Sequence, residues 1–137
     1  MRRAAVVVGL ALLGCGSGER SFEAPMTLGG EEVSADVLNF GELVYMQRCR
    51  GCHGQHGEGD GPYGSAMDPR PADLTRGVYR HLEGERPSDA ELERVITEGI
   101  DGTGMTAIDL EGEPLNAVIQ YIKTLAPRTW RDDQRVQ

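Results

Sequence analysis

Aromatic residues and clustered positive charge are both scarce in this chain. Phe, Trp and Tyr together make up 5% of 137 residues, so a core built from side chains alone would be thin. The 14 basic residues are outnumbered by 22 acidic ones, the net charge is −8, and no basic cluster favours binding to nucleic acid. The length suits one small domain, and we find no internal repeat.

The longest apolar run is too short to cross a bilayer. It covers residues 4–13 and follows a Met-Arg-Arg start, which is typical of an export signal rather than of a mature transmembrane helix. The run ends Leu-Leu-Gly before Cys15, and this ending resembles the lipobox of bacterial lipoproteins. In that family the cysteine becomes the first mature residue and carries a diacylglyceryl thioether. We therefore expect residues 1–14 to be removed and Cys15 to be lipidated; the alternative is an ordinary signal peptide with a chance cysteine.

Loss of this leader would make the exported protein strongly acidic. Arg2 and Arg3 would go with it, which leaves 12 basic residues against 22 acidic ones, a balance of −10. Residues 16–36 are rich in Gly, Ser and Glu and show no apolar periodicity, which predicts a flexible tether. The alternative is a partly ordered arm on the domain. We expect residues 15–36 to be the lipidated N-terminus and tether, and residues 128–137 to be a C-terminal tail.

Two of the three cysteines stand in the run Cys49-Arg50-Gly51-Cys52-His53. This Cys-x-x-Cys-His pattern is the attachment signature of c-type haem. Two thiols at that spacing can form thioether bonds to the two vinyl groups of one porphyrin, and the histidine that follows supplies the proximal iron ligand. The pattern predicts one covalent haem c, with Cys49 and Cys52 attached to it and His53 on its iron.

Three other interpretations of this motif stay open. A zinc site could use Cys49 and Cys52, but no second Cys-x-x-Cys or His pair follows at finger spacing. A thioredoxin-type redox pair needs a βαβ context, and the sequence has no convincing strand run. A disulfide between the two thiols would close a loop too small to stabilise the fold much.

Apolar periodicity predicts three helices and no sheet. They cover residues 37–49, a segment from Ser88 to Gly99 that opens with a capping-box pattern, and a segment from Pro114 to Pro127. Their predicted buried positions recur at spacings of three and four. These positions are Val37, Phe40, Leu43 and Val44 in the first helix, Leu92, Val95 and Ile96 in the second, and Leu115, Val118, Ile122 and Leu125 in the third.

Residues 37–127 resemble a class I, monohaem cytochrome c, here in a bacterial lipoprotein form. In that family the N-terminal helix has a glycine, an aromatic residue four positions later and the first haem cysteine four after that, and the C-terminal helix has an apolar–aromatic pair spaced by three. The matching residues are Gly41, Tyr45 and Cys49 in the first helix and Val118 and Tyr121 in the third. The resemblance implies an all-α fold of orthogonal helices around one covalently attached haem, with the glycine as the close helix contact.

The same resemblance assigns roles to the loops after the haem motif. Residues 54–62 are rich in glycine and residues 69–79 continue the pattern of a bacterial subgroup whose loops wrap the haem edge. By resemblance, a proline carbonyl accepts the Nδ1 proton of the axial histidine, and Pro62 is our candidate. Three arginines are candidates for pairing with the haem propionates, with solvated loop charges as the alternative for each. They are Arg70, Arg76 and Arg80.

The sixth iron ligand must come from the distal side. Met105 ends a Gly-Thr-Gly-Met run where the family places its methionine, although Thr106 stands where proline is usual. The flanking glycines free the backbone to press the thioether onto the iron. The other candidates are Met67, His81, Met46 and His56. The last two are held too near the proximal side, and Met67 is expected to pack at the haem edge, which leaves His81 or an open position as the alternative.

Ligation by methionine and histidine saturates the iron, favours electron transfer over binding of small molecules and raises the potential. We therefore expect an exported, lipid-anchored, monohaem electron carrier that faces the periplasm or the cell exterior and is not itself an enzyme. Its acidic surface should steer it to redox proteins with basic docking patches. The alternatives are a fixed haem subunit of a larger membrane oxidoreductase complex, and a ligand-binding or catalytic haem protein with an open distal site.

Overall fold

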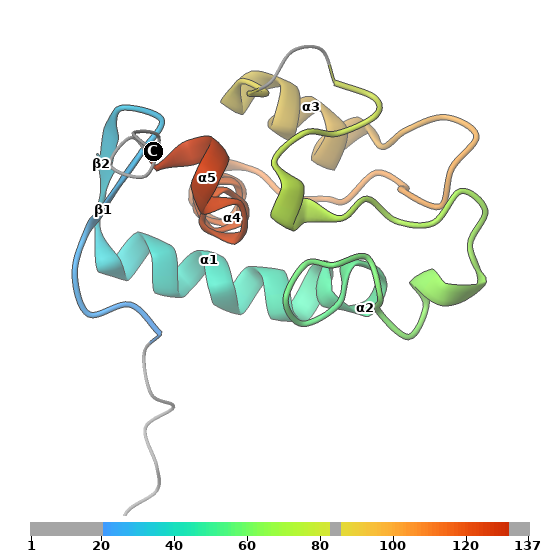
Figure 1. The fold of residues 1–137 in the computed structure, drawn as a ribbon, viewed down its shortest axis with the longest axis horizontal. Coiled ribbons are helices and arrows are strands. Elements are labelled where there is room, and N and C mark those ends of the chain that lie inside the picture. Colours follow the sequence, from blue (N-terminus) through green and yellow to red (C-terminus); the bar gives the residue numbers. More distant parts are fainter. Residues whose placement is uncertain (1–20, 83–85, 132–137) are drawn as a thin grey trace, which may run out of the picture.

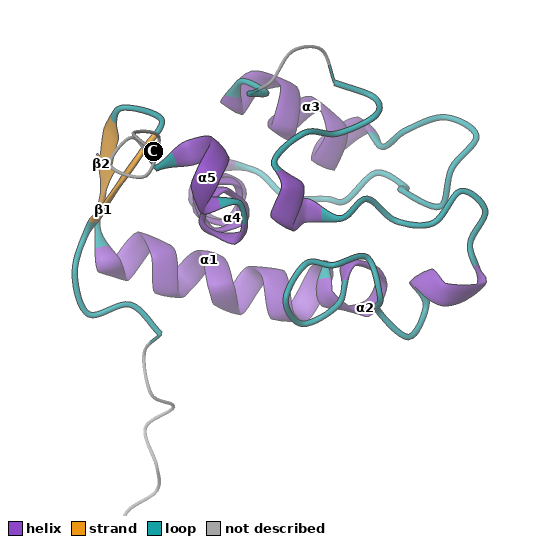
Figure 2. Cartoon of the chain, in the orientation of Figure 1, coloured by secondary structure: helices purple, strands orange, loops and turns teal. Residues whose placement is uncertain are grey.

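The computed structural model describes residues 21–82 and 86–131, so the predicted leader, Cys15 and the end of the predicted tail lie outside the described residues. The fold is mainly helical, as predicted, with one small hairpin (Figures 1 and 2). No helix in the described part is long and apolar enough to cross a membrane. The elements are β1 (Met26–Leu28), β2 (Glu31–Val33), α1 (Ala35–Arg48), α2 (Arg50–His53), the 3-10 turns η1 (Gly64–Ala66) and η2 (Leu74–Arg76), α3 (Asp89–Glu98), α4 (Gly112–Leu125) and α5 (Pro127–Trp130).

Helices α1 and α4 form the centre of the fold and cross at Gly41. Figure 1 shows α1 along its length and α4 almost end-on. A side-chain carbon added to Gly41 would lie 2.6 Å from the carbonyl carbon of Ala117 and 2.8 Å from Cβ of Tyr121. The ring centroids of Tyr45 and Tyr121 lie 5.2 Å apart beside the crossing. The predicted close contact at this glycine is therefore present, and only a residue without Cβ permits it.

The predicted buried stripe of α1 is only partly right. Leu38, Gly41, Val44 and Tyr45 are buried, whereas Leu43, which we expected on the stripe, is 52% exposed. Apolar residues occur on several sides of this helix, so periodicity alone does not select one face. The docking of α4 at Gly41 selects the face that is buried.

The start of α3 follows its sequence signal closely. The backbone N–H of Glu91 donates to Oγ of Ser88 over 3.2 Å, and the backbone N–H of Ser88 donates to the Glu91 carboxylate over 2.8 Å. This is the predicted capping box. On the next turns Leu92 and Ile96 are buried. The capping box joins residues three positions apart and needs no contact with another element. The sequence therefore predicts the start of this helix well.

Residues 21–36 do not form the flexible tether that their composition predicts. Strands β1 and β2 pair in antiparallel fashion, Leu28 is fully buried, and the backbone N–H of Gly29 donates to the carbonyl of Trp130 over 2.8 Å. Trp130 is also buried, so residues 128–131 belong to the fold and not to a tail. Both predictions are wrong here because the hairpin and α5, distant in sequence, bury each other.

The chain just before the hairpin is also fastened to the helices. The backbone N–H of Phe22 donates to Oδ1 of Asn39 over 3.1 Å, and the Asn39 amide donates back to the Phe22 carbonyl over 2.9 Å. The Phe22 ring meets the Tyr121 ring edge-on, with centroids 6.1 Å apart. The first described residues therefore lie on the α1–α4 crossing.

Leu28→Ala is expected to lower the free energy of unfolding by about 2–5 kcal/mol, because it removes a fully buried side chain. Denaturant unfolding followed by circular dichroism measures this change. The matched control is Thr27→Ala, an exposed position on the same strand, for which we expect less than about 0.5 kcal/mol. Equal stability of the two variants would show that the hairpin does not pack on the domain.

Candidate functional site

The cysteines and the histidine of the motif lie in one turn at the end of α1. Cys49 caps α1, and Cys52 and His53 belong to the short helix α2. The backbone N–H groups of Cys52 and His53 both donate to the Cys49 carbonyl, over 3.2 and 3.0 Å. Both thiols are free, so the structure does not contain the disulfide considered as an alternative. One hydrogen-bonded turn thus brings together all three residues that the motif predicts.

The glycine-rich loop folds back onto this turn and holds it. Three consecutive carbonyls of the turn accept hydrogen bonds from backbone N–H groups of the loop, and the Tyr45 hydroxyl donates to the Gly54 carbonyl over 2.7 Å. The three pairs are Tyr63 to Gly51 at 2.9 Å, Gly61 to Cys52 at 3.1 Å and Gly59 to His53 at 2.8 Å. The motif is therefore rigid because its polar backbone groups are paired on the loop side.

A backbone carbonyl orients the imidazole of His53. Its Nδ1 lies 3.1 Å from the carbonyl oxygen of Ala72, and a carbonyl can only accept, so Nδ1 carries the proton and Nε2 keeps its lone pair. Burial lowers the pKa of His53, and the bond to Ala72 opposes this effect. The ring is therefore neutral at pH 7, which is the form that ligates metals.

Pro62 does not accept the Nδ1 proton, so our prediction for this residue is wrong. Its carbonyl accepts instead from the Ser65 hydroxyl over 3.3 Å. The acceptor, Ala72, follows Pro71, whose ring packs against Gly64 and so brings the next carbonyl to the motif. Sequence reasoning missed Ala72 because a backbone acceptor requires no particular side chain and leaves no signal.

The thiol of Cys49 is unsuited to redox exchange. Burial raises the pKa of Cys49 to about 11, Arg48 opposes this shift, and the neighbouring Cys52 adds to it. Reactive cysteines of thioredoxin-type pairs have a lowered pKa instead. Among the residues that the structure describes, no group of three or more His, Cys, Asp or Glu side chains could hold a metal ion. The raised pKa disfavours the redox pair, and within the described residues no third ligand joins the two cysteines in a zinc site.

Met105 lies in a loop that is hydrogen-bonded to the end of α3. The Ile100 N–H donates to the Met105 carbonyl over 2.8 Å, and the Ile108 N–H donates to the Ile96 carbonyl in α3 over 2.9 Å. The Met105 N–H donates to Oγ1 of Thr103 over 3.1 Å. The Met105 side chain is half-buried against the core. The backbone at Met105 is thus fixed relative to α3.

The other distal candidates lie in different surroundings. A side-chain carbon on Gly104 would meet the sulfur of Met67, so the Met67 thioether packs on the residue just before Met105. His81 lines a hollow of about 300 Å³ together with Glu98 of α3. Met67 therefore lies against the loop that carries Met105, although it belongs to a different loop, between η1 and η2. His81 shares its hollow with the start of the Met105 loop, at Gly99 and Ile100.

The three arginines predicted for propionate pairing are exposed, around η2. They are Arg70, Arg76 and Arg80. The Arg76 carbonyl accepts from the Thr129 hydroxyl over 3.4 Å, which ties η2 to α5. Their pairing with propionates stays a prediction.

The comparisons with known proteins agree with this geometry. Residues 37–122, more than half of the chain, match the family described as cytochrome C oxidase, cbb3-type, subunit III. The chain belongs to this cytochrome c family. No curated protein matches the sequence. A similar solved structure is a chain of the Kuenenia stuttgartiensis reducing HAO-like protein complex Kustc0457/Kustc0458, with 31% sequence identity and a TM-score of 0.60 over 65% of this chain and 42% of that chain.

This cytochrome c therefore spans less than half the length of the chain that it matches in that complex. Membership of the family identifies it as a haem c electron-transfer protein. The residues present fit the cofactor, because two free thiols stand three positions apart beside a neutral imidazole whose Nε2 is available.

Proposed function

We propose that this protein is a class I electron carrier with one haem, covalently held by Cys49 and Cys52, and with His53 and Met105 as the axial ligands of the iron. The observation that carries the proposal is the rigid turn in which the Ala72 carbonyl fixes the Nδ1 proton of His53. When bound, the haem supplies a one-electron change between ferrous and ferric iron. The hydrogen bond from Nδ1 makes His53 a stronger donor, and the Met105 thioether raises the potential.

Substitution of the cysteines tests covalent attachment. The parent protein is expected to keep its haem on a denaturing gel, because thioether bonds survive unfolding. Cys49→Ala and Cys52→Ala should each retain at most one bond, and the double variant none. Haem staining of the gel measures this, and Cys15→Ser is the control that should leave the stain unchanged. Haem of the parent protein that extracts into acidified organic solvent would refute covalent attachment.

The proposed carrier is exported and anchored by lipid at Cys15, facing the periplasm or the cell exterior. The short apolar run and the lipobox-like ending support this proposal. Among the residues that the structure describes, Phe22 is the first that is hydrogen-bonded to the helices, and it lies seven positions after Cys15. Seven residues span at most about 25 Å, so the anchor would hold the domain close to the membrane surface.

Cys15→Ser is expected to release the protein from membranes while its absorbance spectrum stays the same. The lipid chains supply the anchor, at about 0.8 kcal/mol for each buried CH₂ group. Sedimentation of cell membranes followed by haem staining measures the distribution. If Cys15→Ser still sediments with membranes, another segment or a partner holds the protein there.

A fixed subunit of an oxidoreductase complex is the second candidate function. It is favoured by the similarity to a chain of a larger complex and by the family description, which names an oxidase subunit. Purification in high salt separates the candidates. A free carrier that docks its acidic surface on basic patches should leave its partners as salt screens the charges, whereas a subunit should co-purify with them.

A further inference from the structure

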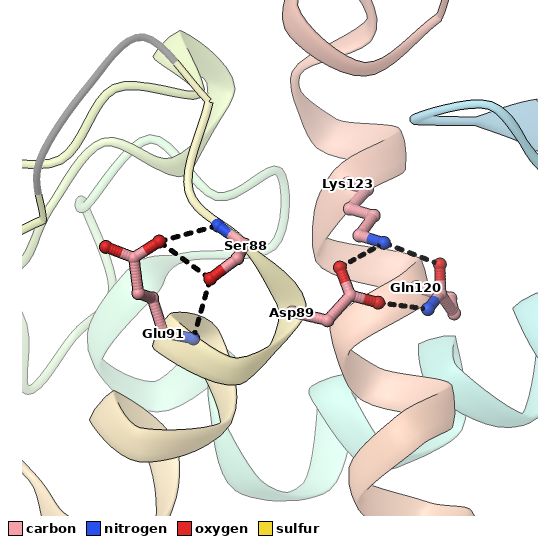
Figure 3. Close-up of polar contacts among 5 residues, drawn as sticks. All are labelled: Ser88, Asp89, Glu91, Gln120 and Lys123. Carbon is pink, nitrogen blue, oxygen red and sulfur yellow. Dashed lines mark hydrogen bonds and ion pairs between the residues drawn. The ribbon is translucent and has the colours of Figure 1, made fainter.

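A buried cation joins α3 to α4. Lys123 in α4 is 3% exposed, and its Nζ lies 2.5 Å from Oδ1 of Asp89 in α3. Gln120 completes a triangle, because its amide donates to Oδ2 of Asp89 over 2.9 Å and its oxygen accepts from Nζ over 3.1 Å (Figure 3). The ammonium group also lies over the Trp130 ring, 5.4 Å from its centroid. We name Asp89, Gln120 and Lys123 the clamp.

The clamp holds the first turn of α3, and the loop that carries Met105 is hydrogen-bonded to the last turn of the same helix. Asp89 is the first residue of α3, where the helix dipole also favours a carboxylate. The last turn of α3 binds the loop through the Ile108 bond to Ile96, and the loop is closed by the Ile100 bond to Met105. A shift of α3 on α4 would therefore move the loop with it.

A buried ammonium group makes such a shift costly. Movement of Asp89, whose own side chain is 45% exposed, would leave the buried ammonium group of Lys123 without its counterion. The same movement would break the bond between Asp89 and Gln120, so both contacts that join α3 to α4 in the clamp are lost together. The bond between Lys123 and Gln120 lies within α4 and would stay.

We propose that the clamp positions the Met105 loop and so sets how firmly the Met105 thioether is held at the iron. This inference rests on Met105 being the distal ligand, as proposed above. The clamp residues are positioning residues, since they act through α3 and its loop.

Imidazole is a suitable probe, because it competes with the thioether for ferric iron and its apparent affinity reports how readily Met105 leaves. Lys123→Met and Asp89→Asn are each expected to raise imidazole affinity about tenfold, a size typical of coupling between separate sites. The iron–sulfur absorbance band of the oxidised holoprotein should weaken in parallel. Asp89→Glu keeps the charge and should lie closer to the parent protein than Asp89→Asn does.

Ser88→Ala is the matched control. It removes the capping box from the same turn of α3 (Figure 3) but leaves the clamp in place. It should lower the denaturation midpoint, as the clamp variants do, and leave imidazole affinity within about twofold of the parent value. Unfolding midpoints of all variants are measured beside the affinities, so that loss of stability and loss of positioning are separated.

Lys123→Met leaves Asp89 without its cation, but that side chain is 45% exposed, so this variant should fold even where Asp89→Asn, which leaves a buried ammonium group unpaired, fails to fold. Parent-like imidazole affinity in folded Lys123→Met would overturn the proposal, and so would an equal rise in Ser88→Ala. A parent protein without the iron–sulfur band would refute Met105 ligation and the clamp's role together. A parent protein with the band, and clamp variants that match it, would refute the role of the clamp alone.

Discussion

Met105→Ala is expected to lower the midpoint potential by more than about 100 mV, which is about 2.3 kcal/mol for one electron. The thioether stabilises ferrous iron relative to ferric iron, so its loss favours the oxidised state. The opened position should also bind cyanide or carbon monoxide far faster than the parent protein does. A redox titration and the rate of ligand binding measure the two effects.

Met67→Ala is the control for this prediction. The Met67 thioether packs on Gly104, next to Met105, and its loss should leave both the potential and the iron–sulfur band close to those of the parent protein. If Met67→Ala removed the band and Met105→Ala did not, the ligand assignment would be reversed. If neither variant changed the spectrum, the distal position would be open or held by another residue, and a ligand-binding function would be favoured.

Gly41→Val is expected to destabilise the protein by about 3 kcal/mol or more, at the upper end of the cost of overpacking. Its Cβ would lie within 3 Å of the Ala117 backbone and of Cβ of Tyr121, and backbone cannot yield as a flexible side chain can. The helices would have to separate, so the denaturant midpoint should fall steeply.

Leu43→Val is the control for Gly41→Val, because it lies in the same helix, introduces the same β-branched residue and is 52% exposed. Its effect should stay below about 0.5 kcal/mol. Similar midpoints for the two variants would show that the α1–α4 crossing does not need the glycine. Guanidinium unfolding of the holoprotein, followed by circular dichroism, compares them.

Local signals carried most of what could be predicted about the fold. The capping box at Ser88 and Glu91, the apolar positions of α4 and the Cys-x-x-Cys-His turn each involve residues within a few positions of one another. Their geometry depends on backbone periodicity and on hydrogen bonds between residues a few positions apart, and neither requires contact with a distant segment. The helical class and the members of the motif turn were predictable for that reason.

The predictions of a flexible tether and of a C-terminal tail were wrong because both segments depend on contacts between distant parts of the chain. The hairpin before α1 and the burial of Trp130 depend on each other across about a hundred positions of sequence. The composition of either segment alone indicates solvated chain, because it contains too few apolar residues to form a core without its partner.

The sequence by itself was enough to predict the cofactor of this cytochrome c, because the two thiols and the imidazole that haem c needs lie within five positions of the chain. Only the tertiary structure decided which carbonyl orients His53, which face of α1 is buried and how α3 is fastened to α4. Ala72, Gly41 and the pair of Asp89 with Lys123 have these roles through contacts with distant residues. Such contacts depend on how close-packed elements fit against one another, and the sequence of a single segment does not specify that fit.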